Sequence, residues 1–255
     1  MDNEFKIVGY AFAWNEEAVV PYVMEYWRKA VDKLYVFVYG VLDKTVEKLG
    51  EYSDFVEIID YVSPETYFNK KLLASAKNNC WKVNKGKCDC SIVSDLACPP
   101  IALEGYDVRE IIKNAFKQFS AVTFRMYHAY RMKGVDGITP EKYLNGKYTF
   151  FVRNDSNNNY FIFNPNTTEE TNFEYVGSWK PNEAERADVY YGAIFVDFTH
   201  FQRDWSINRD IVADNFRTQK HTVKRLNDSY MLNLKRGVNL KEIPITEEEN
   251  EDEQK

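Results

Sequence analysis

Four short apolar runs, separated by amphipathic stretches, most strongly constrain the fold of the N-terminal part of the chain. The run at residues 5–12 shows little alternation of polar and apolar side chains, which is typical of a parallel strand covered on both faces. Similar runs occupy residues 34–39, 55–62 and 90–95. The stretch between the first two runs places four apolar residues at helical spacing: Val20, Val23, Met24 and Trp27. This alternation predicts an open parallel sheet with right-handed crossovers.

The pattern continues beyond the fourth run and then loosens. We predict helices at residues 16–30, 43–52, 67–83 and 107–119. A fifth strand is expected at residues 121–127, followed by shorter strands at 148–153, 159–165 and 189–201 and a helical segment at 206–237. The expected fold class is therefore α/β, with an open, mostly parallel sheet flanked by helices in a single domain of residues 1–237.

The charge and hydropathy of the chain exclude some classes of partner. The formal net charge is −6, and most of this excess lies in the acidic tail at residues 238–255, which is predicted to be disordered. A nucleic-acid partner is not expected, because binding phosphates requires a basic face. The opening "MDNEFK" is acidic and the apolar run after it is short, so we expect no signal peptide, no transmembrane segment and a cytoplasmic location.

All four cysteines fall within one short stretch of the chain. They are Cys80, Cys88, Cys90 and Cys98. In a cytoplasmic protein we expect them to be reduced thiols, either buried or half-buried. A zinc site is the alternative, although the spacing lacks the paired C-x-x-C hooks that are usual for structural zinc.

Ligands of an open parallel sheet bind outside the carboxyl ends of its strands, so the residues at those ends are the candidates for function. They are Trp14, Asn15 and Glu16 after the first strand, residues 40–43 after the second, Asp60 in the third and Asp95 at the end of the fourth. The sequence contains neither G-x-G-x-x-G nor G-x-x-x-x-G-K-[ST], which argues against dinucleotide and P-loop sites. It also lacks G-x-S-x-G, which argues against an α/β-hydrolase.

Several motifs, in order along the chain, resemble those of the GT-A glycosyltransferases, in particular the family 2 and family 92-like group. The opening "KIVGYAFAWNEE" resembles that group's strand, Asn-Glu-Glu turn and helix, and "DKT" at residues 43–45 resembles the end of its Asp-x-x-Ser-x-Asp-x-Thr stretch. "NNCWKVNKGKCDCSIVSDLAC" resembles its Asn-Asn-x-Trp-Lys helix and Asp-x-Asp strand. "FIFNPNTTEETNF" and "FVDFTHFQRD" resemble its later strands.

The resemblance implies a nucleotide-binding half at residues 1–127 and an acceptor-side half with C-terminal helices at residues 128–237. It implies transfer of a sugar from a nucleotide-diphospho-sugar to a glycan, lipid or protein hydroxyl, with Mn²⁺ or Mg²⁺ at the diphosphate. Asp95 and His200 are the implied metal ligands. The expected donor-binding residues are Trp14, Asn15, Glu16, Asp43, Asp60, Asn79, Lys82 and Asp95. Asp188 and Glu185, just before the last strand, are the candidates for the carboxylate that takes the acceptor proton.

The chain departs from the family pattern at several polar positions. The second acid of the metal motif is Ala97, the acid that often follows is Cys98, and the base-recognising acid of the second strand is Val38. These losses favour a second hypothesis, a catalytically degenerate domain that binds a nucleotide or a partner. Asn15, Glu16 and Asp43 can also act as helix caps, and His200 as a core residue. Three lysines form either a solvated basic turn or a substitute for the metal: Lys82, Lys85 and Lys87.

Overall fold

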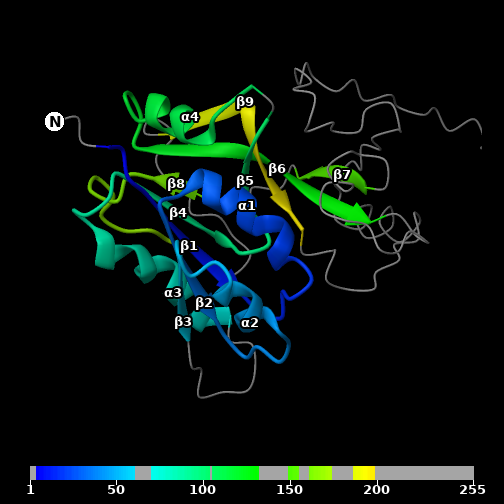
Figure 1. The fold of residues 1–255 in the computed structure, drawn as a ribbon. Helices are drawn as coiled ribbons and strands as arrows, with labels where there is room; N and C mark the ends of the chain where they lie inside the picture. Colours follow the sequence, from blue (N-terminus) through cyan, green and yellow to red (C-terminus); the bar gives the residue numbers. More distant parts are fainter. Residues whose placement is uncertain are drawn as a thin grey trace, which may run out of the picture.

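A computed structural model describes residues 4–60, 70–103, 105–131, 149–154, 161–173 and 186–198 of the chain. Nine strands of these segments form one sheet, in which eight follow the order β3-β2-β1-β4-β8-β6-β9-β5 and β7 pairs with β6 (Figure 1). The expected fold class, an open α/β sheet flanked by helices, is confirmed.

The N-terminal part of the sheet is parallel, as the sequence predicts. It consists of β1 (Ile7–Ala13), β2 (Lys33–Val38), β3 (Val56–Asp60) and β4 (Cys90–Asp95), and every pairing among them is parallel. The described helical elements between these strands are α1 (Val20–Ala30), α2 (Thr45–Gly50), α3 (Lys70–Asn79) and the 3₁₀ helix η1 (Cys80–Asn84). The predicted helix at residues 67–83 therefore changes to 3₁₀ geometry at Cys80.

Strand β1 is buried along its whole length because helices cover both of its faces. Side chains alternate along a strand, so Ile7, Ala11 and Ala13 join the core that contains α1. Val8, Tyr10 and Phe12 face the other way, into a second core that includes Leu73 and Ala76 of α3. Because both faces of β1 are covered, its sequence shows little alternation of polar and apolar side chains.

The second part of the sheet is mixed. Strand β8 (Phe161–Phe163) pairs antiparallel with β4 and with β6 (Ala121–Arg131), whereas β9 (Arg186–Asp197) runs parallel to β6. Strands β5 (Pro100–Ala102) and β7 (Thr149–Asn154) add antiparallel pairings. Helix α4 (Val108–Ala115) contributes to the same core as α1, and Asp107 caps it by accepting hydrogen bonds from two backbone N–H groups.

The predicted start of the first helix at residue 16 is wrong. Asn15 has a φ of +50°, a left-handed conformation that asparagine tolerates better than most residues, and a turn then precedes the helix. The Glu16 carbonyl accepts hydrogen bonds from the N–H groups of Val19 and Val20 in this turn. Helix α1 begins at Val20, which places Pro21 in its first turn, where the missing N–H costs no helical hydrogen bond.

Some predictions fall outside the described residues. These are the helical segment at residues 206–237 and the acidic tail at residues 238–255. The proposed division of the domain after residue 127 stays a prediction. Within the described segments, no helix combines the length and apolar character needed to cross a membrane.

Gly9 provides a test of the packing between β1 and α1. A Cβ atom built on Gly9 would lie 2.7 Å from Leu34 Cδ1 and 3.1 Å from Val31 Cγ1, and both of these atoms are in the core. We expect Gly9→Ala to lower the free energy of unfolding by about 1–3 kcal/mol through overpacking, measured by urea denaturation. Gly50→Ala is the matched control, because nothing lies within 4 Å of its Cβ position. Equal stability of the two variants would contradict this packing.

Candidate functional site

Six of the described strands run toward one edge of the sheet. Strands β1, β2, β3 and β4 are parallel, and β8 is antiparallel to both β4 and β6. Strand β6 therefore runs in the direction of β4, and so does β9, which is parallel to β6. The carboxyl ends of β1, β2, β3, β4, β6 and β9 consequently face the same way, and we call this side of the sheet the carboxyl edge.

The order of the strands reverses at a definite point of the carboxyl edge. From β1 the chain continues to β2 and β3 on one side, and β4 then pairs with the opposite side of β1. Such a reversal is a topological switch point, where open α/β sheets bind their ligands. Residues 14–16 follow β1 and Asp95 ends β4, so both predicted stretches lie at this point.

Asp95 forms an ion pair with Lys77 of α3. Asp95 is in register with Phe12 of β1, and the alternation of side chains places it on the α3 side of the sheet with Val93. Lys77 Nζ lies 2.8 Å from Asp95 Oδ1, and the exposed fractions of the two side chains are 7% and 34%. The ammonium also lies 5.6 Å from the centroid of the Phe12 ring. Asp95 is therefore accessible, whereas its partner is almost completely covered.

Lys77 was not singled out from the sequence, although a signal existed. It lies on the face of α3 that carries Leu73, Ala76 and Cys80, all of which are buried in the same core. A lysine within an apolar helical stripe must find a partner for its charge when the helix packs. The sequence alone does not say that this partner is eighteen residues further along the chain.

The segment that follows Asp95 is part of the core. Leu96, Ala97 and Cys98 are completely buried. The Leu96 carbonyl accepts a hydrogen bond from the Trp27 indole N–H (3.0 Å), and the Ala97 carbonyl accepts one from the Phe198 N–H (2.8 Å). An acid at position 97 or 98 of this backbone would place a charge in the apolar core, at a large cost.

The hydrogen bond between Phe198 and Ala97 brings a second carboxylate to the site. Asp197 precedes Phe198, ends β9 and is buried. Burial raises the pKa of the Cys98 thiol well above its usual range, the charges of Asp197 and Asp95 raise it further, and Lys77 lowers it. Three charged side chains thus surround Cys98. Asp197 stands inside the quoted "FVDFTHF" stretch, but nothing in its local pattern distinguished it from the other acids.

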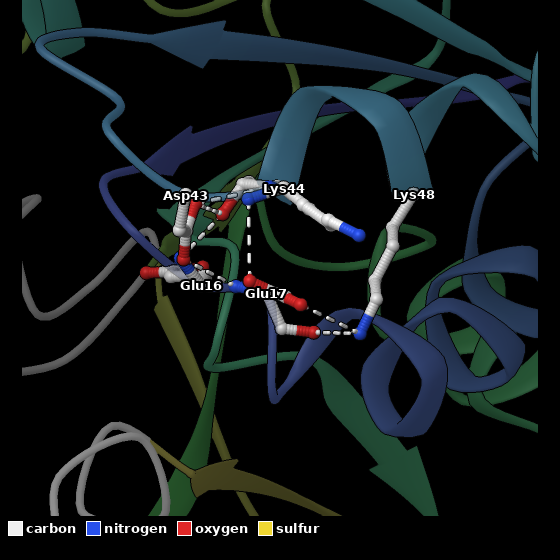
Figure 2. A network of polar contacts seen from close by, with 6 residues as sticks. Glu16, Glu17, Asp43, Lys44 and Lys48 are labelled. Atoms are coloured by element: carbon white, nitrogen blue, oxygen red, sulfur yellow. Dashed lines mark hydrogen bonds and ion pairs between the residues drawn. The ribbon is translucent and has the colours of Figure 1, made fainter.

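A network of hydrogen bonds fixes the loops that follow β1 and β2 (Figure 2). Asp43 accepts hydrogen bonds from the N–H groups of Glu17 and Thr45, both at 3.0 Å. Thr45 Oγ1 accepts one from the Glu16 N–H at 2.6 Å, and Lys48 Nζ donates to the Glu17 carbonyl at 3.0 Å. Desolvation raises the pKa of Asp43, but the hydrogen bonds from Thr45 and Glu17 outweigh it and the net pKa is lowered.

Asn15 and Asp43 therefore connect the loop after β1 to the loop after β2. Asn15 Oδ1 accepts a hydrogen bond from the Leu42 N–H (2.6 Å), and it does not cap α1, whose N-cap is Val19. The N-cap of α2 is Lys44 and not Asp43, which lies one residue earlier and accepts a hydrogen bond from the Thr45 N–H.

Trp14 is the aromatic side chain of the carboxyl edge. Its indole N–H donates a hydrogen bond to the Gly40 carbonyl (3.1 Å), and 40% of the residue is exposed. Asp60 is exposed at the end of β3, in register with Val38, whose own side chain is buried. The edge thus carries an exposed indole and an exposed carboxylate on the side of β1 away from β4.

Several predicted residues do not come to the carboxyl edge. Asn79 ends α3, and Lys82 lies in η1 beside the loop that leads to the start of β4. Lys82 Nζ donates to Asn79 Oδ1 at 3.0 Å. The other two lysines of the turn donate to backbone carbonyls: Lys85 to Thr168 and Lys87 to Val83.

The predicted acceptor-side residues are placed only in part. Asp188 lies near the beginning of β9, in register with Thr123, whereas Asp197 ends the same strand. Glu185 and His200 fall outside the described residues. The assignments of Asp188, Glu185 and His200 stay predictions.

The cysteines are four free, buried thiols. Burial raises the pKa of each of them. Among the residues that the structure describes, no three His, Cys, Asp or Glu side chains gather closely enough to hold a metal ion. The donor set that these residues offer Mn²⁺ or Mg²⁺ is therefore poor, because Asp95 is paired with an ammonium and positions 97 and 98 provide no oxygen ligand.

The chain has distant structural similarities only. No family model and no curated protein matches it. HddC from Yersinia pseudotuberculosis is 12% identical, with a TM-score of 0.40 over 83% of this chain and 99% of that one. TarS 1–349 from S. aureus is 13% identical, with a TM-score of 0.35 over 63% of this chain and 47% of that one. The same protein in complex with UDP is also 13% identical, with a TM-score of 0.34 over 53% of this chain and 38% of that one.

The chain thus spans less than half of the length of the TarS chains that it matches. The strand order and strand directions define the class of this protein on their own: an α/β protein with an open, mixed sheet and a topological switch point between β1 and β4.

Asp43 allows the loop network to be tested. We expect Asp43→Ala to lower the free energy of unfolding by about 1–3 kcal/mol near neutral pH, because two backbone N–H groups lose a charged acceptor. Since the pKa of Asp43 is lowered in the folded chain, its contribution is present above the ordinary carboxyl pKa and is lost as the pH falls through the folded pKa. The difference from wild type should therefore shrink below about pH 4.

Urea denaturation at a series of pH values measures this difference. Glu51→Ala, which removes an exposed acid just after α2, is the matched control and should show little change. A stability loss that is equal for the two variants, or that does not change with pH, would contradict the role of Asp43.

Proposed function

We propose that this chain is a glycosyltransferase of the GT-A type, which binds a nucleotide-diphospho-sugar at the carboxyl edge and transfers the sugar to a hydroxyl acceptor. The observation that carries the proposal is the position of Asp95 at the switch point, at the end of a parallel strand and paired with Lys77. The resemblance of the sequence motifs supports it, because the segment from residue 78 to residue 98 has the order of the family's helix and metal-motif strand.

The donor side of the site would lie between the loops after β1 and β2 and the end of β4. Trp14 offers an exposed indole face on which a base or a sugar can stack. Asn15, Glu16 and Asp43 would shape the loops rather than hold the donor directly, since their backbone or side-chain groups take part in the loop network. Lys77 and Asp95 would face the diphosphate, and Asp60 the outer side of the donor. Asn79 and Lys82 would take no part.

The reaction requires a group that takes the proton of the acceptor hydroxyl. The oxygen of the acceptor hydroxyl attacks the anomeric carbon, the bond from that carbon to the diphosphate oxygen breaks, and the nucleoside diphosphate leaves. A carboxylate must take the proton of the hydroxyl. We assign this role to Asp197, because it ends a strand at the carboxyl edge and one hydrogen bond joins the next residue to the segment after Asp95.

A binding protein without catalysis is the second candidate. The burial of Ala97 and Cys98 favours it, because no acid can replace the missing ligands at these positions without a change in the core. The two candidates share donor binding and differ in turnover.

A panel of nucleotide-diphospho-sugars separates the two candidates. We expect one or more of them to raise the melting temperature of the full chain by mass action, and the same donor to be hydrolysed or transferred. Asp95→Ala should reduce this shift, whereas Asp54→Ala, which removes a surface partner of Arg28, should leave it unchanged. A donor that binds and is never turned over would favour the binding protein. If no nucleotide-sugar and no nucleoside diphosphate binds, the proposed function fails.

Asp197 and Asp188 allow the proton acceptor to be identified. Once a donor is known, we expect Asp197→Asn to lower kcat by about 10²–10⁴-fold with little change in donor KM, which is the usual contribution of a general base. Asp188→Asn should retain most of the activity, because Asp188 lies near the opposite end of β9. The reverse result, with Asp188→Asn inactive and Asp197→Asn active, would restore the assignment made from the sequence.

A further inference from the structure

We infer that Lys77 occupies the cation position of this site, so that the chain binds its diphosphate ligand without a divalent metal ion. The inference deepens the proposed function and rests on it for the identity of the ligand. Its central claim, that the Lys77 ammonium excludes a metal from Asp95, concerns only residues of this chain and can be tested with Mn²⁺ alone.

The first step rests on the distance between the Lys77 and Asp95 side chains. A Mg²⁺ ion lies about 2.0–2.1 Å from its oxygen ligands, and Mn²⁺ has similar requirements. Lys77 Nζ lies 2.8 Å from Asp95 Oδ1 and takes one of the two lone-pair directions of that oxygen, so a metal ion bound in that direction would overlap the ammonium. On the other carboxylate oxygen it would lie within a few ångströms of a positive charge, which repels it.

The position of the ammonium is fixed by packing, which is the second step. The Lys77 side chain is 7% exposed and leaves α3 on the face that contacts β1 and β4. Side chains of a helix lean toward its N-terminus, and α3 enters the sheet from the side on which β3 ends. The ammonium therefore reaches toward the carboxyl edge, and the Phe12 ring, 5.6 Å away, stabilises it there.

The remaining ligands complete the argument. A hard divalent cation needs several oxygen ligands, more than the carboxylates of Asp95 and Asp197 supply on their own. Ala97 and Cys98 are buried and offer none. Within the described part of the chain, no cluster of metal-binding side chains includes Asp95. The site has thus lost an acid where the metal motif would have one and has a lysine where the metal would lie.

The paired charges of Lys77 and Asp95 suit a diphosphate ligand. The Lys77 charge neutralises Asp95, whose carboxylate would otherwise repel the ligand from the switch point. Asp95 in turn holds the ammonium at the carboxyl edge. The Lys77 ammonium belongs to the protein itself, so the affinity for the diphosphate should be insensitive to chelators.

Mn²⁺ binding to the full chain tests the inference. Wild type, Lys77→Met, Lys77→Arg, Asp95→Asn and the double variant with both Lys77→Met and Asp95→Asn are freed of metal with a chelator. Each is then titrated with Mn²⁺, and free Mn²⁺ is measured by electron paramagnetic resonance. We expect no Mn²⁺ binding in wild type that depends on Asp95. Lys77→Met should gain a site with at least about tenfold higher affinity, because the repelling charge is gone.

The other variants decide whether the new site is the one proposed. The gain should disappear in the double variant, and Lys77→Arg, which keeps the charge, should behave as wild type. Lys77→Gln repeats the measurement if circular dichroism shows that Lys77→Met is unfolded. Asp95-dependent binding of Mn²⁺ to wild type would overturn the inference. A folded Lys77→Met or Lys77→Gln variant that gains no Mn²⁺ site would overturn it as well.

A second titration, with a nucleoside diphosphate, separates this inference from the proposed function. We expect wild type to bind a uridine or guanosine diphosphate equally well in chelator and in Mn²⁺. Binding that requires Mn²⁺ would overturn the inference and leave the proposed function intact. If neither nucleotide binds under either condition, the proposed function loses its support, and the Mn²⁺ titrations still decide the role of Lys77.

Discussion

The burial of β1 on both faces is the constraint on which the site depends. Because helices cover both faces of β1, its side chains pack alternately against α1 and α3. The same alternation in β4 directs Asp95 toward α3, where it forms an ion pair with Lys77. The ion pair at the switch point therefore follows from the way in which the centre of the sheet is covered.

The order of strands and helices in the N-terminal half could be predicted from the sequence, because continuous apolar runs and helical periodicity are local signals. The position of Asp95 at a strand end followed from the same signals. The start of α1 could not be predicted, since the left-handed conformation of Asn15 and the hydrogen bonds of Glu16 determine it. Asp197 and Lys77 were missed because their importance comes from contacts between segments that are distant in the sequence.

The same comparison changes the interpretation of Ala97 and Cys98. From the sequence, Ala97 and Cys98 are losses from an Asp-x-Asp site. In the fold, both residues belong to a core segment that hydrogen bonds to the end of β9, and the charge of Asp95 is balanced by a lysine. Asp95 thus keeps a partner for its charge within the protein, which distinguishes the proposed site from a metal site that has only decayed.

A crystal structure of the full chain with a nucleoside diphosphate, grown in the presence of a chelator, tests the central claim most directly. The account predicts electron density for the diphosphate at the switch point between β1 and β4, beside Lys77 and Asp95, with no metal ion between them. Density for the nucleotide at the opposite edge of the sheet, beside Asn79 and Lys82, would contradict it. A nucleotide that appears at the switch point only when Mn²⁺ is added, with the metal bound to Asp95, would contradict the role of Lys77.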